Sequence, residues 1–149
     1  MIEANATSSP TKTKQINFVR SVLIPISLAA WGGLKGPASE AIRFLQMHLN
    51  GGQFAGVRIL SPESVSLMQQ IQLSSKGDPL QFALGWFVID DPEHPYVEHA
   101  GGGVGIRDLM RLYPEEGLAI VLMSNAGGYD ELTVVDAAAN VIFSMLEGR

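Results

Sequence analysis

The residues of this chain that could do chemistry gather in one short stretch, residues 97–125. His99 stands just before four closely spaced glycines, at positions 101–103 and 105. An imidazole exchanges a proton near neutral pH, and glycines let a backbone lie against a ligand with no Cβ in the way. We therefore expect the chemistry of this protein at this junction.

The same residues also have a structural interpretation, which stays open at this point. His99 could be a hydrogen-bonded histidine at the end of a strand, and the glycines could form a bulged hairpin without a ligand. A dinucleotide site is excluded, because Ile106 stands where the third glycine of the fingerprint should be. A strand follows, and it offers no helix N-terminus for a pyrophosphate.

The acidic stretch at residues 90–95 contains Asp90, Asp91, Glu93 and His94, close in sequence to His99. Such a set could be mistaken for a metal site. Acidic turns between strands are usually solvated, so we expect no metal here and no cofactor elsewhere in the chain.

Strands must position these residues. Residues 96–99 and 106–113 are predicted strands on either side of the glycines, and residues 114–117 form a hairpin turn. The strand at 118–123 is apolar on both faces, which predicts helices on both sides of it. Residues 82–89, FALGWFVI, suit one further strand. Asn125 follows the last strand, where we expect it to stabilise a turn.

Three helices are predicted around these strands. The first covers residues 37–49 and ends at Asn50-Gly51-Gly52, with His48 expected on its surface near the C-terminus. Ser61 is a good N-cap for the second helix. The apolar stripe of the third helix is expected to consist of Leu132, Val135, Ala139, Ile142 and Leu146. The fold class is therefore α+β, an antiparallel sheet with flanking helices.

Composition limits the partners. The chain has 149 residues, a formal net charge of −5 and no cysteine, so nucleic acid binding and thiolate chemistry are excluded. No run reaches the roughly 18 apolar residues of a membrane span. Residues 21–31 faintly resemble a signal peptide, but we expect them to be a buried segment that enters the domain. The sequence does not fix the compartment.

The motifs in the second half of the chain resemble the serine β-lactamase and penicillin-binding-protein superfamily, in its class C-like esterase or D-peptidase branch. His99-x-Gly101-Gly102 is similar to the motif, Lys-Thr-Gly or His-x-Gly, that ends the strand beside the active site. RILSPESVSLM at 58–68 and LGWFV at 84–88 agree with it. The resemblance covers residues 32–149, the C-terminal part of a β-lactamase-like α/β sandwich, whereas residues 1–31 are a polar tail and an apolar lead-in.

The resemblance implies a role for each residue of the motif. The N–H of Gly102 would be one donor of the oxyanion hole, and His99 would take the place of the motif's Lys. Ala100, Gly101 and Gly103 would bind the substrate. Where the family has Thr, its hydroxyl helps to hold a substrate carboxylate, and Ala100 has no such donor. Esters or small amides are therefore favoured over β-lactams.

The resemblance has one clear departure. The family places its Ser-x-x-Lys nucleophile helix and a tyrosine motif well upstream of Gly32, where this chain has too few residues for them. Ser9 and Lys12 do match Ser-x-x-Lys, but we expect this to be chance within a polar tail. The implied function is a serine hydrolase that forms an acyl-serine and is incomplete in this chain. The alternative is a non-catalytic binding or assembly module. Either would self-associate or pair with an N-terminal portion.

Overall fold

The computed structural model describes residues 32, 34–103 and 105–148, and the part from Leu34 onward forms one unit. The interpretations of residues 1–31, including Ser9 and Lys12, fall outside the described residues. Along the chain the elements are α2 (Ala38–Leu49), β1 (Gln53–Phe54), β2 (Val57–Arg58), α3 (Pro62–Gln69), β3 (Phe87–Ile89), β4 (Tyr96–Gly103), β5 (Ile106–Tyr113), β6 (Leu118–Ser124) and α4 (Glu131–Glu147).

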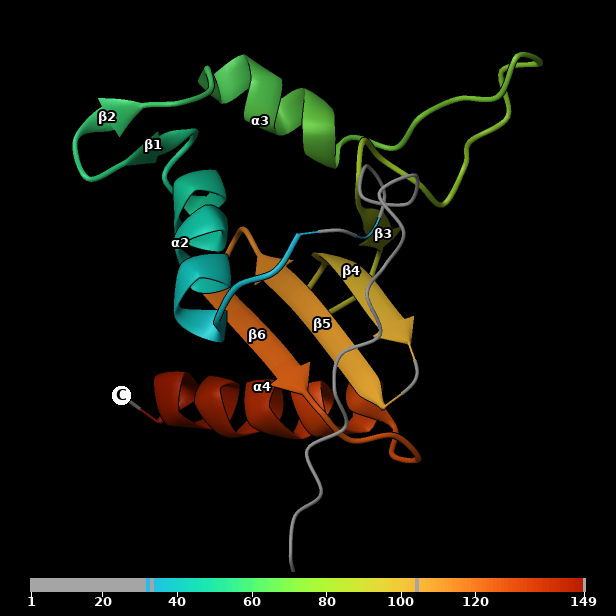
Figure 1. Cartoon of the computed structure of the whole chain (residues 1–149). Coiled ribbons are helices and arrows are strands. Elements are labelled where there is room, and N and C mark those ends of the chain that lie inside the picture. Colours follow the sequence, from blue (N-terminus) through green and yellow to red (C-terminus); the bar gives the residue numbers. More distant parts are fainter. Residues whose placement is uncertain (1–31, 33, 104, 149) are drawn as a thin grey trace, which may run out of the picture. The chain divides into compact units, whose positions relative to one another are not determined.

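The four longer strands form one antiparallel sheet in the order β3-β4-β5-β6, as Figure 1 shows. β5 and β6 pair through the predicted turn, with Tyr113 opposite Leu118 and Arg107 opposite Ser124. The predicted α+β architecture and the predicted pairing of these two strands are confirmed. β1 and β2 form a separate small hairpin between α2 and α3.

The glycines differ from the prediction, because three of them belong to a strand and not to the turn. β4 continues through Gly103, and residues 101–103 pair with Ile106, Arg107 and Asp108 of β5. Only residues 104–105 connect the two strands, and Gly105 has a φ of +71°, which favours glycine. The glycine segment is thus held in a fixed, extended register.

The strand predicted at residues 82–89 is wrong over its first five residues. Only Phe87–Ile89 forms β3. Upstream, the chain reverses at Gly85, which has a φ of +86°, and the N–H of Ala83 donates to the carbonyl of Trp86 at 2.8 Å. The apolar composition of residues 82–89 did not reveal this turn, because the turn depends on the conformation of a single residue, Gly85.

Helices cover both faces of the sheet, and the side chains of β6 alternate between them. Ala119 and Val121 pack on the side of α2, where Leu45, Trp86, Val97 and Leu112 form the core. On the opposite face, Leu118 and Ile120 pack with Tyr113, Ala139 and Phe143, the last two from α4. The predicted helices on both sides of this strand are thus present, in α2 and α4.

The prediction for the buried face of α4 needs correction. α4 buries Val135, Ala139 and Phe143, while the predicted stripe residues Leu132 and Leu146 are 43% and 45% exposed. Steps of four residues along a helix keep one face toward the sheet, and Phe143 continues that face. By contrast, the expected helix boundaries at Asn50 and Ser61 are confirmed by the ends of α2 and α3.

His48 is not on the surface of α2 as predicted; it is only 3% exposed. Its ring packs edge-on against Phe44 and Trp86, with centroids 4.7 and 5.4 Å away. Burial lowers the pKa of His48, because the charged imidazole is poorly solvated there. Neither ring nitrogen has a hydrogen-bond partner among the residues that the structure describes.

None of the helices within the described residues is long and apolar enough to cross a membrane.

Candidate functional site

The predicted site lies where one edge of β4 becomes free. β3 pairs only with Tyr96, Val97 and Glu98 of β4. From residue 99 to residue 103, β4 has β5 on one side and, among the described strands, no neighbour on the other. All five of these residues are exposed. An open strand edge presents unpaired backbone N–H and C=O groups to a ligand.

Two glycines of this edge, Gly101 and Gly103, have no structural need to be glycine among the described residues. A Cβ built on Gly101 or Gly103 would meet nothing within 4 Å. The backbone of these two residues has no positive φ either. Packing therefore does not require glycine at these two positions. The absence of side chains there suits the close approach of a ligand from outside the sheet.

Gly102 has a charged neighbour that the sequence analysis did not identify. A Cβ on Gly102 would lie 2.9 Å from Nη1 of Arg107, the residue opposite it on β5. The Arg107 side chain is 46% exposed, and its Nη1 is 3.9 Å from Oε1 of Glu131. A cation therefore stands beside the predicted oxyanion donor. Counting residues symmetrically about the short turn would have placed Arg107 there.

His99 is exposed and lies beside an aromatic ring. The centroids of His99 and Phe87 are 6.1 Å apart, with an angle of 45° between the rings. Phe82, in turn, lies 5.1 Å from Phe87. Motif reasoning missed both phenylalanines, although Phe87 directly follows the LGW residues that supported the resemblance.

The site places His99, Ala100 and the three glycines on one free edge of β4. It offers an imidazole, backbone donors and a nearby guanidinium, which are suited to holding a carbonyl group and its developing negative charge. Residues 34–148 contain no Ser-x-x-Lys, and the one such match in the chain, Ser9 to Lys12, lies outside the described residues.

A second polar cluster is centred on Arg111, in the interior of β5. Its guanidinium is 2% exposed and contacts Glu98 at 2.8 Å and Asp136 at 2.6 Å, and donates to the Tyr113 hydroxyl at 3.0 Å. The Tyr96 ring lies 4.0 Å below it. Burial by itself would lower the pKa of Arg111, but its hydrogen bonds and the nearby carboxylates raise it. The guanidinium therefore stays charged.

The Arg111 cluster opens into a polar cavity of about 250 Å³ between the sheet, α4 and the acidic turn. At this turn, His94 lies 2.6 Å from Glu116 and stacks on Phe143 at 3.7 Å. Asp91 accepts backbone hydrogen bonds from Glu93 and His94, which lower the pKa of its carboxyl group. These contacts tie the turn between β3 and β4 to the turn between β5 and β6 and to α4, which gives the cluster a structural role.

Within the described part of the chain, no group of three or more His, Asp or Glu residues is placed to hold a metal ion. The side chain that stabilises the turn after β6 is Ser124, whose hydroxyl accepts from the N–H of Ala126 at 3.0 Å. The role in this turn expected for Asn125 stays a prediction.

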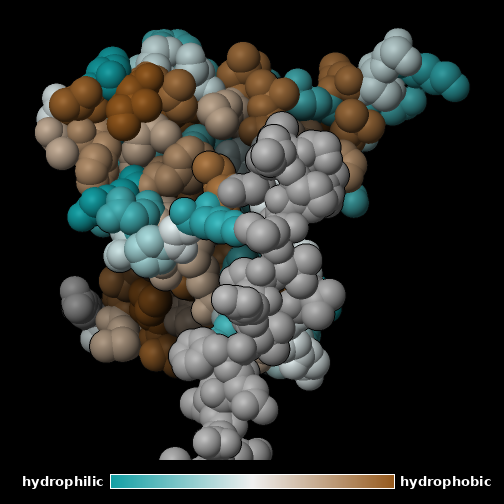
Figure 2. Space-filling view, viewed as in Figure 1, coloured by the Kyte–Doolittle hydropathy of each residue, from teal (hydrophilic) through white to brown (hydrophobic). Residues whose placement is uncertain are grey.

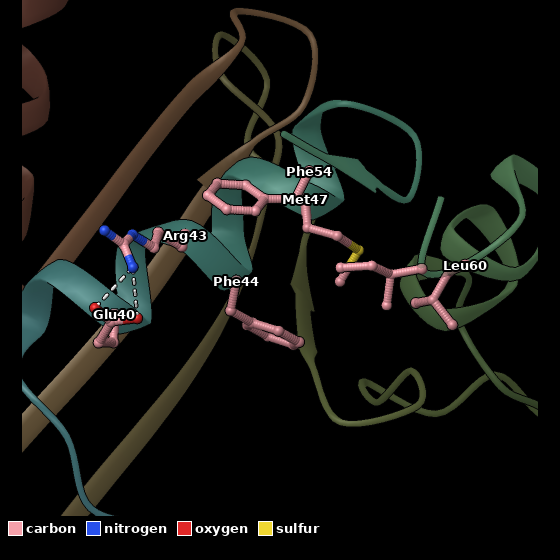
Figure 3. A pocket seen from close by; sticks show the side chains of 7 residues that line it. Glu40, Arg43, Phe44, Met47, Phe54 and Leu60 are labelled. Carbon is pink, nitrogen blue, oxygen red and sulfur yellow. Dashed lines mark hydrogen bonds and ion pairs between the residues drawn. The ribbon is translucent and has the colours of Figure 1, made fainter. Parts of the chain in front are cut away.

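An open, apolar cavity of about 420 Å³ lies between α2 and the β1–β2 hairpin (Figure 3). Phe44, Met47, Phe54, Ile59 and Leu60 supply most of its lining. Its charged groups, Glu40 and Arg43, pair with each other at 2.9 Å, as Figure 3 shows. Since none of the predicted site residues lines it, this cavity is separate from the free edge of β4.

Known proteins resemble the chain along most of its length. A model of the Beta-lactamase family matches residues 2–142, so the likeness extends upstream of the motifs that first indicated it. Penicillin-binding protein 4 of Amycolatopsis lactamdurans is 31% identical over 111 residues, which are 70% of this chain and 29% of that protein.

Two proteins of Mycobacterium tuberculosis, Protein Rv1367c and Uncharacterized protein MT1414, are each 37% identical over 87 residues. These residues are 51% of this chain and 22% of either relative, so the chain spans less than a third of the length of the curated relatives it matches. Together with the free, glycine-rich edge of β4 that follows His99, the match over residues 2–142 shows that the chain belongs to the β-lactamase family.

Proposed function

We propose that this chain is the C-terminal portion of a serine hydrolase that transfers the acyl group of an ester or amide through an acyl-serine intermediate. The observation that carries the proposal is the free edge of β4 at residues 99–103, which is exposed and bare of side chains at its glycines in a chain of the β-lactamase family. Such an edge lets backbone donors reach a substrate carbonyl without steric hindrance.

In this proposal the N–H of Gly102 donates to the carbonyl oxygen of the substrate. A serine hydroxyl attacks the carbonyl carbon, its proton passes to a neighbouring base, and the alcohol or amine leaves with a proton. Water then attacks the acyl-serine, which releases the acid and restores the serine. His99 supplies a hydrogen bond or a charge at the reacting centre. Ala100, Gly101 and Gly103 hold the substrate along the strand, and no cofactor is needed.

The substrate class follows from two residues of the strand pair. Ala100 has no side-chain donor, so it does not help to bind a carboxylate as a threonine would. Arg107 stands beside Gly102 and favours the developing negative charge of the carbonyl oxygen. Esters and small amides are therefore proposed as substrates ahead of β-lactams.

A second candidate is a non-catalytic module that binds or assembles with other chains. It is favoured by the outer edge of β6, which has no partner among the described strands and carries the exposed Met123. Open edges recruit other strands. In this case the chain pairs with itself or with an N-terminal portion of the family domain.

The deciding experiment is a burst assay with a chromogenic ester, followed by mass spectrometry of the intact protein. The chain is tested alone and mixed with the N-terminal portion of the family domain. We expect an acyl adduct on a serine of that portion in the mixture, and neither burst nor adduct in the chain alone. No adduct in the mixture would favour the binding module. A stoichiometric adduct on Ser9 of the chain alone, lost in Ser9→Ala and Lys12→Ala, would make this chain the complete enzyme.

A further inference from the structure

The segment between α3 and β3 forms an arm that returns to the sheet next to His99. Its two limbs are joined by hydrogen bonds of 2.8 Å, from the N–H of Leu80 to the carbonyl of Gln72 and from the N–H of Gln72 to the carbonyl of Phe82. Leu73 and Pro79 form a bridge farther out. Figure 1 shows this arm projecting between α3 and β3. Its base is thus a narrow, ordered pair of chain segments.

Large apolar side chains are exposed along this arm and into β3. They are Ile71, Leu73, Leu80, Phe82, Leu84 and Phe87. In Figure 2 the base of the arm is hydrophobic, while its tip is hydrophilic. Exposed apolar side chains that gather in one place mark a binding surface, whereas single ones need no explanation.

The two phenylalanines stand where the free edge of β4 begins. Phe87 pairs with Glu98, the last residue of β4 that has β3 beside it, and its ring lies 6.1 Å from that of His99. Phe82 lies 5.1 Å from Phe87 and is 50% exposed. A ligand that lies along residues 99–103 therefore has an aromatic wall at its His99 end.

We propose that Phe82 and Phe87 bind an apolar group of the substrate, so that the site takes esters of acids with an aryl-bearing acyl chain. The inference rests on the proposed function, because it places the substrate carbonyl at Gly102. His99 stands three positions before Gly102, which is about 10 Å of strand. A 4-phenylbutyryl chain whose carbonyl accepts from Gly102 extends along the strand in the direction of His99 and Phe87.

The test is a binding experiment, which needs no nucleophile. Amide spectra of the ¹⁵N-labelled chain are recorded during titration with methyl 4-phenylbutyrate and, separately, with methyl acetate. We expect saturable shifts at Gly101, Gly102 and Gly103 with the phenyl ester. Binding of the phenyl ester should weaken about tenfold in Phe87→Ala, because the ring loses its apolar contact area. Phe82→Ala should show a loss in the same direction.

Phe44→Ala is the matched control, because Phe44 is 43% exposed and packs on Trp86 instead of His99. It should bind the phenyl ester like the unchanged chain. Phe87→Leu keeps an apolar residue in the strand and removes only the aromatic ring. It replaces Phe87→Ala in the experiment if that variant does not fold. Methyl acetate should bind equally weakly to all of these variants.

Equal affinity for the phenyl ester in the unchanged chain and in the folded Phe82 and Phe87 variants would overturn the inference. Shifts confined to the arm, without the glycines, would also overturn it, and would point to a protein partner at the arm. Ring-dependent binding at the glycines without any acyl adduct in the burst assay would support the aromatic wall and refute the proposed hydrolysis. The two proposals can thus fail separately.

Discussion

Nη1 of Arg111, in the interior of the sheet, lies 2.6 Å from Oδ1 of Asp136 on α4. Through the same guanidinium, Glu98 of β4 and Tyr113 of β5 are joined to the helix. Arg111 is therefore the only described cation that ties α4 to two strands by ion pairs and hydrogen bonds, on the sheet face opposite to α2.

Arg111→Met should lower the free energy of unfolding by about 3–5 kcal/mol, because Glu98 and Asp136 lose the cation that compensates them. Asp136→Asn should cost only about 1 kcal/mol, since the Asp136 side chain is 55% exposed and solvent screens its charge. Urea denaturation measures both. Arg43→Gln, in an exposed pair, is the control and should change stability by less than about 0.5 kcal/mol. Equal effects at Arg43 and Arg111 would contradict the role of the buried cluster.

His48→Leu should raise the stability by about 1–2 kcal/mol, because it removes two buried nitrogens that have no hydrogen-bond partner within the described part of the chain. The gain should grow below the ordinary pKa of histidine. The folded chain lowers the pKa of His48, so the unfolded chain binds more protons and stability falls as the pH drops through this range. Unfolding curves between about pH 5 and pH 8 should be flatter for His48→Leu. Parallel pH profiles for the two proteins would rule out His48 as the source.

Gly52→Ala should be strongly destabilising, by about 3 kcal/mol or more, because backbone atoms on both sides would have to move. Its φ is +90°, and a Cβ there would lie 2.2 Å from the carbonyl oxygen of Leu60. Gly77 also has a positive φ, but among the described residues a Cβ would meet nothing. Gly77→Ala should therefore cost only about 1–2 kcal/mol, from the backbone conformation alone. Thermal melts of the two variants separate the clash from the strain.

Gly102→Val should reduce the proposed ester turnover about 10²- to 10³-fold, since the branched side chain displaces the carbonyl from its donor. The fold should persist, because the one close contact of a Cβ there is with the end of the flexible Arg107 side chain, while the carbonyl oxygen of Ile106 lies at an ordinary contact distance of 3.6 Å. Circular dichroism and turnover are measured on one sample of the chain mixed with the N-terminal portion. Gly127→Ala, where a Cβ has open space, is the control. Full turnover in folded Gly102→Val would remove this residue from the oxyanion hole.

The chain alone should associate through the open edge of β6, and light scattering at increasing concentration should show it. Met123→Lys places a charge on this strand, where Met123 is 39% exposed, and should shift the chain toward monomer. Met145→Lys introduces the same charge on the exposed side of α4 and should leave the association unchanged. If the unchanged chain is a monomer, the predicted association is wrong. If Met145→Lys alone reduces the association, the interface lies on α4 and not on β6.

The sequence by itself determined the fold class, the strands on either side of the glycine segment, the end of α2 and the start of α3. These features depend on local signals, such as the alternation of apolar and polar residues, the cap at Ser61 and the glycines after Asn50. Each signal lies within a few consecutive residues. It also identified His99 and the glycines as the candidate site, through their order along the chain.

Tertiary structure alone decided where β4 loses its neighbour, since that depends on where β3 begins after the chain turns at Gly85. It also buried His48 and brought Arg107 to Gly102, because burial and cross-strand contacts depend on register between elements. The same holds for Phe87 beside His99. Hydrophobic periodicity predicts on which side of a helix or strand a residue lies. Only the packing of segments that are distant in the sequence determines which residues it contacts there.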